Sequence, residues 1–334
     1  MPDHGGRLNA AAEKYNIAIE HWLDLSTGIN PHGWPVPEIP ARVFNRLPED
    51  DDGLIAAARK YYAVDDVLPV AGSQAAIQLL PHLRTPCRVA VPDVAYAEHA
   101  HAWQQAGHDV FALNNEQIDQ QIDQLDVLVL INPNNPTAKV FSREQLLHWH
   151  QRLARRNGWL IVDEAFMDAS AEHSLLPETG QANLIVLRSL GKFFGLAGIR
   201  CGFVMAEKKL LHKLSEKLGP WSLTNPTRFI ARQALQDTAW QAQARADLKI
   251  ESARLKQLLK QSFDLEPQGT VLFQTVFMEQ ACEIHHQLAC QGVLTRLLDN
   301  QQGIRFGLPR DEQWQQLEKV LQLIRHQQND CMTV

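Results

Sequence analysis

Paired cysteines are missing from this chain of 334 residues. Its cysteines are odd in number and form no C-x-x-C pair, and they are Cys87, Cys201, Cys282, Cys290 and Cys331. This usage argues against a disulfide framework and favours reduced thiols in a cytoplasmic protein. No window approaches the roughly 20 apolar residues of a membrane span. The first residues, M-P-D-H-G-G-R, lack the apolar core of a secretion signal, so we expect neither feature.

An excess of positive charge is also missing. Lys and Arg number 32 against 38 for Asp and Glu, which gives a net charge of -6. No basic stripe occurs, so the charge argues against nucleic acid as a partner. Apolar residues make up 45% and charged residues 21%, as in ordinary globular proteins. The length allows one large domain and a smaller one.

Metal-binding spacings are lacking among the 14 histidines. The clusters are the pairs His99/His101, His148/His150 and His285/His286. Residues two positions apart do not share a helix face, and no H-E-x-x-H motif occurs. We therefore predict no metal site and expect these histidines to lie on the surfaces of helices.

Apolar runs alternate with helix-like segments from about residue 66 to residue 206. The runs predict strands over 67–72, 88–92, 109–113, 126–133, 159–165 and 184–189. Several are continuously hydrophobic, as expected of strands covered on both faces. A helix is predicted from Ser142 to Asn157, with Ser142 as its N-cap. The pattern favours an α/β domain built on a mostly parallel sheet.

The remainder of the chain predicts a smaller α+β domain. A long helical stretch follows Pro226 to about Gln261, and strands are expected over 270–278, 293–296 and 303–308 before a last helix from Asp311. The first 40 residues are rich in Gly, Pro and Asn. We predict an arm over 1–40 that contributes to the small domain and the substrate site. A large domain over 41–224 and a long helix with the small domain over 225–334 follow.

Polar motifs stand at the ends of four predicted strands, where open α/β sheets bind their ligands. The segment S-L-G-K-F-F-G-L-A-G-I-R, residues 189–200, places Lys192 just after the apolar run L-I-V-L. The other motifs are A-G-S-Q (71–74), N-P-N-N-P-T (132–137) and D-E-A-F (163–166). A lysine at a strand end is unusual, because lysine normally lies on solvated surfaces.

Together these motifs meet the needs of pyridoxal 5'-phosphate. Its aldehyde needs a lysine, and its pyridinium nitrogen needs a carboxylate. Its phosphate needs backbone N–H groups, hydroxyls and an arginine. Lys192 and Asp163 supply the first two, and the phosphate ligands would be Gly72, Ser73, Gln74, Ser189 and Arg200. We therefore predict this cofactor.

On these motifs the chain resembles the fold-type I pyridoxal-phosphate enzymes of the aspartate aminotransferase superfamily. The resemblance covers nearly the whole chain and implies a mostly parallel seven-stranded sheet domain with a smaller α+β domain. It implies that Lys192 forms the Schiff base and Asp163 partners the ring nitrogen. By the same resemblance Tyr96 stacks on the ring, Asn135 lies at the phenolic oxygen and the substrate, and Arg305 grips a substrate carboxylate.

The arm motifs D-H-G-G-R-L-N-A-A-A (3–12) and D-L-S-T-G-I-N-P-H-G (24–33) resemble threonine-phosphate decarboxylases of cobalamin biosynthesis. These enzymes are close relatives of histidinol-phosphate aminotransferases. The resemblance implies that His4, Gly5 and Gly28 lie at the substrate and that Arg296 faces its phosphate. A flexible glycine-rich terminus is the alternative for this arm.

The resemblance implies a homodimeric decarboxylase that converts L-threonine O-3-phosphate to (R)-1-aminopropan-2-ol O-phosphate. Histidinol-phosphate or another class I/II aminotransferase is the alternative enzyme. A cofactor-binding regulator without turnover is disfavoured, because no basic helix-turn-helix segment occurs. The chain departs from many relatives at Phe166, where they carry Tyr, and at Ala138, where they carry Gly. Leu47 stands where relatives often have a Tyr that reaches the partner subunit's cofactor phosphate.

Overall fold

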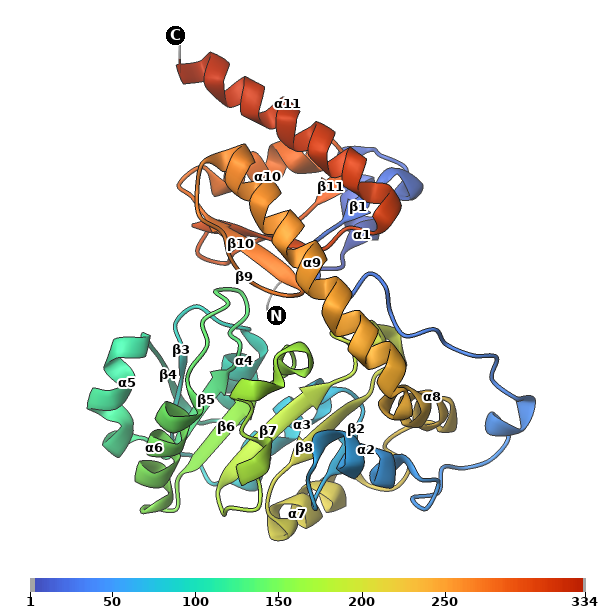
Figure 1. Cartoon of the computed structure of the whole chain (residues 1–334). Coiled ribbons are helices and arrows are strands. Elements are labelled where there is room, and N and C mark those ends of the chain that lie inside the picture. The colour runs from blue at the N-terminus through green and yellow to red at the C-terminus, as the bar shows by residue number, and fades with distance from the viewer. Residues whose placement is uncertain (1–3, 333–334) are drawn as a thin grey trace. The chain divides into compact units, whose positions relative to one another are not determined.

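The structure is a computed structural model that describes residues 4–332, which form two compact units (Figure 1). Unit 1 comprises residues 33–135 and 139–242. Unit 2 comprises residues 4–32, 136–138 and 243–332. Most of the predicted arm therefore belongs to unit 2. Residues 1–3 of that arm and 333–334 of the predicted small domain lie outside the described residues.

Unit 1 is built on a seven-stranded sheet with the order β2-β8-β7-β6-β5-β3-β4. Every strand is parallel to the rest except β8, which is antiparallel to both of its neighbours. The predicted mostly parallel sheet is confirmed, and β8 is the strand that the sequence analysis did not single out. The strands are β2 Leu68–Val70, β3 Arg88–Pro92, β4 Asp109–Leu113, β5 Val127–Ile131, β6 Trp159–Asp163, β7 Leu184–Ser189 and β8 Gly202–Met205.

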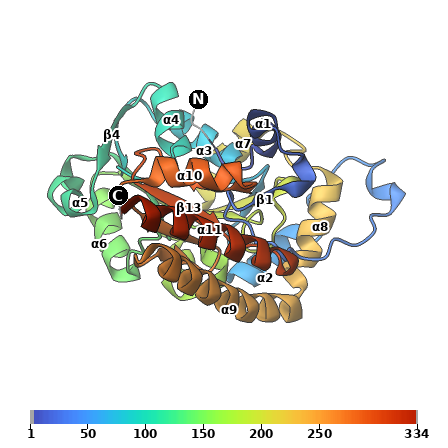
Figure 2. The same cartoon turned by 90° about the horizontal axis from the view of Figure 1, so that it is seen from above.

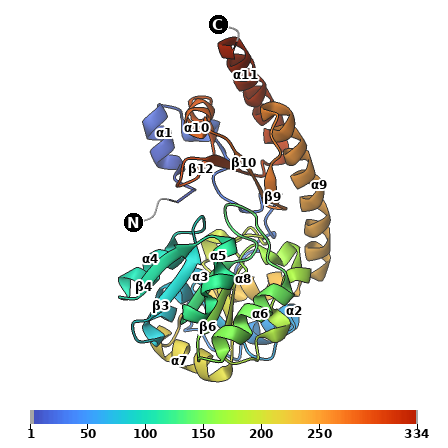
Figure 3. The ribbon, with the colours of Figure 1, turned by 90° about the vertical axis from the view of Figure 1, so that its left-hand side faces the viewer.

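Helices cover both faces of this sheet, which explains the continuous apolar strands. All residues of β5, β6 and β7 are buried. Figure 3 shows α3 and α4 toward one face and α2 and α6 toward the other. Ser142 caps α6 by accepting a hydrogen bond from the Gln145 amide, 3.1 Å away, as predicted. The helices are α2 Leu54–Tyr62, α3 Ser73–Leu79, α4 Glu98–Gln105, α5 Asn115–Gln121, α6 Arg143–Ala154, α7 Lys208–Leu218 and α8 Asn225–Gln236.

Unit 2 contains an antiparallel sheet with the order β12-β13-β10-β9 and a parallel pair of β1 with β11. The strand expected over 293–296 is divided at Thr295, so that its halves join different sheets. The strands are β1 Leu23–Asp24, β9 Gln268–Thr270, β10 Phe273–Phe277, β11 Val293–Leu294, β12 Arg296–Leu297 and β13 Gly303–Gly307.

Four helices accompany these strands. Figure 2 shows α9, α10 and α11 running roughly alongside one another, and Arg254 of α9 forms an ion pair with Glu318 of α11 at 2.9 Å. Within residues 4–332, no helix has both the length and the apolar character needed to cross a bilayer. The helices are α1 Leu8–Tyr15, α9 Thr238–Phe263, α10 Ala281–Cys290 and α11 Trp314–Met332.

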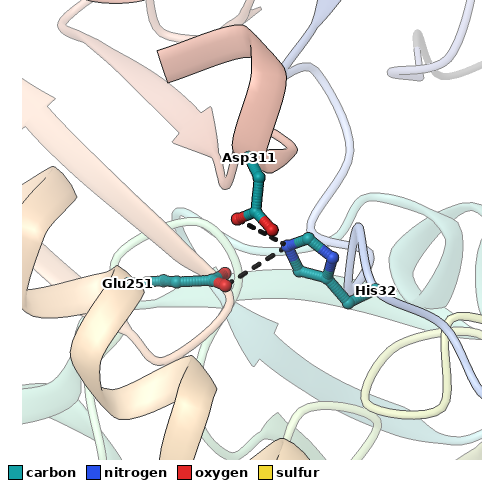
Figure 4. A group of neighbouring side chains, drawn as sticks. All are labelled: His32, Glu251 and Asp311. Carbon is teal, nitrogen blue, oxygen red and sulfur yellow. Dashed lines mark ion pairs between the residues drawn. The ribbon is translucent and has the colours of Figure 1, made fainter.

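One histidine of the arm bridges two carboxylates of unit 2 (Figure 4). The His32 Nε2 lies 3.2 Å from Glu251 of α9 and 3.6 Å from Asp311. Burial raises the pKa of Glu251, and the adjacent His32 opposes that shift. The three side chains present their ligand atoms within 4.8 Å of one another, as a cation site would need. Ion pairs between His32 and the two carboxylates also account for these contacts without a metal ion. The absence of a metal site therefore stays a prediction.

A buried arginine joins the ends of β6 and β7. The Arg188 guanidinium lies 2.9 Å from Glu164 and 2.9 Å from Asp168, and all three side chains are almost fully inaccessible to solvent. The Glu164 amide also donates to the Leu187 carbonyl at 2.9 Å. Since neighbouring positions carry Asp163 and Ser189, this cluster fixes the strand ends that bear the predicted site.

We expect Arg188→Met to be strongly destabilising, because it leaves Glu164 and Asp168 as buried charges without their cation. Loss of one partner of a buried ion pair costs about 3–5 kcal/mol. Urea unfolding followed by circular dichroism measures the change. Arg152→Met, which removes a surface pair with Asp123, is the control and should leave the free energy of unfolding nearly unchanged. Equal effects of the two substitutions would contradict the anchoring role of Arg188.

Candidate active site

The predicted cofactor residues of unit 1 gather at one edge of the seven-stranded sheet. Asp163 is the last residue of β6, and Lys192 follows the end of β7. The Gly72 motif follows β2, Tyr96 follows β3, and Asn135 follows β5. Because these strands are parallel, their carboxyl ends meet at the same edge, where ligands of such sheets bind.

Asp163 is buried and held through both of its carboxylate oxygens. Its Oδ2 lies 2.9 Å from the Nε2 of His99, and its Oδ1 accepts a hydrogen bond from the Ala165 amide at 3.0 Å. His99 is only 2% exposed, so the expectation that it lies on a helix surface is wrong. His150 is also buried, with its Nε2 2.9 Å from the Ala182 carbonyl. Each of these two histidines has a polar partner inside the fold, which compensates for the loss of hydration on burial.

The Lys192 side chain is half-buried beside an aromatic ring. Its Nζ lies 5.3 Å from the centre of the Phe166 ring, a distance suited to a cation–π contact. Ahead of it in the chain, the Ser189 hydroxyl accepts a hydrogen bond from the Gly191 amide at 3.2 Å. The departure at Phe166 therefore lies next to the predicted reactive amine. Because Phe166 has no hydroxyl, its ring cannot form a hydrogen bond with the Lys192 amine.

Arg200 lies against the backbone that precedes α3. Gly72 has a φ of +73°, and a Cβ at this position would come within 2.6 Å of the Arg200 Nη2. A Cβ on Gly202 would come within 2.5 Å of the Ser73 nitrogen. Only glycine permits both close approaches. The guanidinium thus packs directly on the Gly72 backbone, next to the start of α3, as the predicted phosphate site would require.

Tyr96 and Gln74 lie on the same side of this edge. The Tyr96 hydroxyl donates to the Gln74 side-chain oxygen at 3.4 Å, and the Gln74 amide donates to Glu98. The Tyr96 ring centre is 6.3 Å from that of His99. Burial raises the pKa of Tyr96 to about 12, and the charges of Glu98 and Asp163 add to the shift. Tyr96 therefore stays a neutral phenol at physiological pH.

The loop after β5 is shaped by asparagine side chains. Asn132 exchanges hydrogen bonds with both backbone groups of Phe141, and the Asn134 amide donates to the Val94 carbonyl at 2.8 Å. Asn135 follows them and is half-buried. Ala138 has a φ of +58°, a conformation that favours glycine. The alanine at this position therefore imposes local strain.

The two arginines predicted for substrate binding are direct neighbours in unit 2. Arg296 of β12 and Arg305 of β13 are register partners, so their side chains leave the same face of the sheet. Arg305 is buried and donates from Nη2 to the Ser26 carbonyl at 2.6 Å, whereas Arg296 forms an ion pair with Asp299 at 2.7 Å. Burial lowers the pKa of Arg305 to about 10, and the charge of Arg296 adds to this shift.

The two arm motifs meet in unit 2. The Ser26 hydroxyl accepts a hydrogen bond from the Gly6 amide at 2.7 Å and donates to Asp24 at 2.6 Å. A Cβ on Gly5 would lie 2.2 Å from the Ser26 carbonyl oxygen, so only glycine fits there. His4 and Gly5 line a cavity of unit 2 together with Arg296. Among the described residues, the predicted Gly28 and Arg305 are buried but do not line this cavity.

Comparison with known proteins places the chain in a family. Residues 51–304 match the sequence pattern of the family "Aminotransferase class I and II". The chain therefore belongs to the class I and II aminotransferase family, whose members depend on pyridoxal phosphate. It is 49% identical to a threonine-phosphate decarboxylase of Pseudomonas aeruginosa, over 96% of this chain and 97% of the relative. A threonine-phosphate decarboxylase of a Sinorhizobium species is 37% identical, over 92% and 93% of the two chains.

The fold is also that of known pyridoxal-phosphate enzymes. A solved histidinol-phosphate aminotransferase of Sinorhizobium meliloti, in complex with pyridoxal-5'-phosphate, superposes with a TM-score of 0.83 at 16% identity. The match covers 97% of this chain and 96% of the other. At this identity the likeness concerns the fold alone. The fold-type I architecture predicted from the sequence is thereby confirmed.

The residues at the sheet edge fit this cofactor chemically. Asp163 offers a buried carboxylate for a pyridinium nitrogen, and Lys192 offers an amine. Arg200, packed on Gly72, offers a guanidinium suited to a phosphate group. Tyr96 offers a neutral aromatic ring. Nothing in the sequence pointed to His99, because a histidine in a helical segment carries no signal of a carboxylate partner 64 positions away.

We expect Asp163→Asn to reduce turnover by about a hundredfold or more, because it removes a charge that stabilises the reacting cofactor. His99→Gln should reduce it less, since the carboxylate remains and loses only one of its two hydrogen-bond partners. Steady-state kinetics measure both, with cofactor content checked by absorbance after alkaline denaturation. Near-normal turnover of the Asp163→Asn enzyme at full cofactor content would show that Asp163 is only a structural strand-end residue.

Proposed function

We propose that this protein decarboxylates L-threonine O-3-phosphate to (R)-1-aminopropan-2-ol O-phosphate in cobalamin biosynthesis. The relatives at 49% and 37% identity are named threonine-phosphate decarboxylases, and each match spans over nine tenths of both chains. The structural observation that supports it most is the pairing of Arg296 with Arg305 on adjacent strands. A substrate with a carboxylate and a phosphate a few bonds apart needs two such cations close together.

The two arginines would divide the substrate between them. Arg305 is buried, its pKa stays near 10, and its guanidinium is therefore charged at neutral pH. We assign it the substrate carboxylate, which suits a planar bidentate donor. Arg296 lines the basic cavity of unit 2 and is assigned the phosphate.

Bound pyridoxal phosphate would withdraw electrons from the substrate Cα as its bond to the carboxylate breaks. The protein's part is to hold, orient and protonate. Asp163, fixed by His99 and the Ala165 amide, would keep its charge at the ring nitrogen. The Lys192 Nζ would anchor the cofactor and later deliver a proton to Cα, which replaces the carbon dioxide that leaves. Lysine suits this role because its pKa responds readily to its surroundings.

We expect wild-type enzyme to release carbon dioxide from threonine phosphate with no 2-oxo acid present. Arg296→Ala should raise KM about tenfold to a hundredfold while cofactor binding is retained, since one charge-assisted contact is lost. Lys192→Ala should release no carbon dioxide and retain no borohydride-reducible cofactor. Manometry or a coupled carbon dioxide assay, with glutamate measured in parallel, follows the reaction. Product that forms only with 2-oxoglutarate, while glutamate accumulates, would identify an aminotransferase instead.

The protein would act as a cytoplasmic homodimer. Unit 1 exposes several large apolar side chains that a monomer would leave in water, namely Val36, Phe44, Leu47 and Trp221. Phe44 and Leu47 are each 62% exposed. Phe44 and Leu47 lie only three residues apart, so we propose that they form a local apolar patch of the kind that marks an association surface. The cysteines of residues 4–330 are unpaired, which agrees with a reducing compartment.

Replacement of both Phe44 and Leu47 by Asp should weaken the dimer, because charges then enter an apolar contact. Sedimentation velocity at several protein concentrations measures the change. Ile250→Asp, at an exposed apolar position of α9 in unit 2, is the matched control and should sediment like the wild type. A wild-type protein that sediments as a monomer throughout would refute the proposed assembly.

A further inference from the structure

One cavity of unit 2 has an ionisable lining that is mostly basic. It encloses about 430 Å³ beside α1, α10 and β12. Its ionisable lining includes one carboxylate against five basic groups, and these residues are His4, Arg7, Lys14, His285, Arg296 and Asp299. Such a lining attracts an anion. The resemblance implied that His4 lies at the substrate and that Arg296 faces its phosphate, whereas it implied no role for Lys14 or His285.

The ring of His285 is oriented by Thr295, the residue between β11 and β12. Its Nδ1 lies 2.8 Å from the hydroxyl of Thr295, which is buried. This contact occupies Nδ1, and His285 is one of the residues that line the cavity. His286, the next residue, instead contacts the Tyr15 hydroxyl at 3.2 Å and is exposed. The two adjacent histidines therefore have different surroundings.

The surroundings of His285 favour its neutral form. Burial lowers its pKa below the ordinary value, and the charges of Lys14, Arg296 and His286 lower it further. A bound dianion would reverse this potential and favour the imidazolium form. Of the other charged groups around the cavity, Asp299 already pairs with Arg296, so it offsets that arginine in part.

We propose that Lys14 and His285 are further phosphate-binding residues, and that His285 takes up a proton at Nε2 when a dianion enters the cavity. The proton comes from solvent, and the new N–H donates to a phosphate oxygen. The inference rests on the proposed function, which supplies a phosphorylated substrate, and it adds a preference for the dianion. Unphosphorylated threonine gains nothing from either residue.

Linkage fixes the sign of the pH dependence. Because the anion-bound form carries one more proton than the free form, anion affinity must fall as pH rises through the pKa of the bound histidine. A histidine that stayed neutral, or one charged in both states, would give no such dependence.

Isothermal titration calorimetry of the holoenzyme with sodium sulfate tests the proposal. Sulfate does not titrate near neutral pH, so any proton taken up belongs to the protein. Titrations in two buffers of different ionisation enthalpy count these protons. We expect net uptake by the wild type. His285→Asn, which can still hydrogen-bond to Thr295, should lose that uptake and roughly tenfold in sulfate affinity.

His286→Asn is the matched control: it should keep sulfate binding and proton uptake, although the pKa of free His285 rises slightly because one neighbouring charge is removed. Lys14→Gln should weaken sulfate binding yet keep proton uptake. The proposal fails if the wild type binds no sulfate, binds it without proton uptake, or if His285→Asn retains the uptake. A holoenzyme that shows His285-dependent sulfate binding but releases no carbon dioxide from threonine phosphate would overturn the proposed function while leaving the anion site intact.

Discussion

The buried ion cluster of Arg188 is the constraint on which the cofactor site depends. A guanidinium buried with two carboxylates must keep all of its partners, since any lost contact leaves a charge in a medium that cannot solvate it. The cluster therefore ties Glu164 and Asp168, which follow β6, to β7. Asp163 and Lys192 lie one and four residues from these anchors, and their positions follow from it. Rigid support close to reacting groups is what precise catalysis needs.

A second constraint governs unit 2. Arg296 and Arg305 are register partners, and like charges opposite each other are unfavourable in a sheet. The protein offsets this cost with the Ser26 carbonyl and the Asp299 carboxylate. The glycines of the arm allow Ser26 to approach, because a side chain at Gly5 would overlap its carbonyl oxygen. The arm thus helps to stabilise the two adjacent guanidinium groups, and an anionic substrate would neutralise them further.

Local signals in the sequence correctly predicted much of the large sheet. Continuous apolar runs identified six strands, and the polar motifs after them fell at one sheet edge, because parallel strands end together. Local signals failed where a partner was distant. His99 looked like a surface residue until Asp163 was placed beside it. The run 293–296 looked like one strand, but its halves pair with β1 and β13, which lie far away in the chain.

The sequence by itself determined the fold class, the cofactor and the order of the motifs, since each depends on residue type and short-range spacing. Tertiary structure alone decided which side chains carry a partner. It buried His99 against Asp163 and set Arg296 opposite Arg305. It also placed His285, but not the adjacent His286, in the lining of a basic cavity. These outcomes depend on strand register and long-range packing, which no local pattern encodes, and they fix the charges on which function rests.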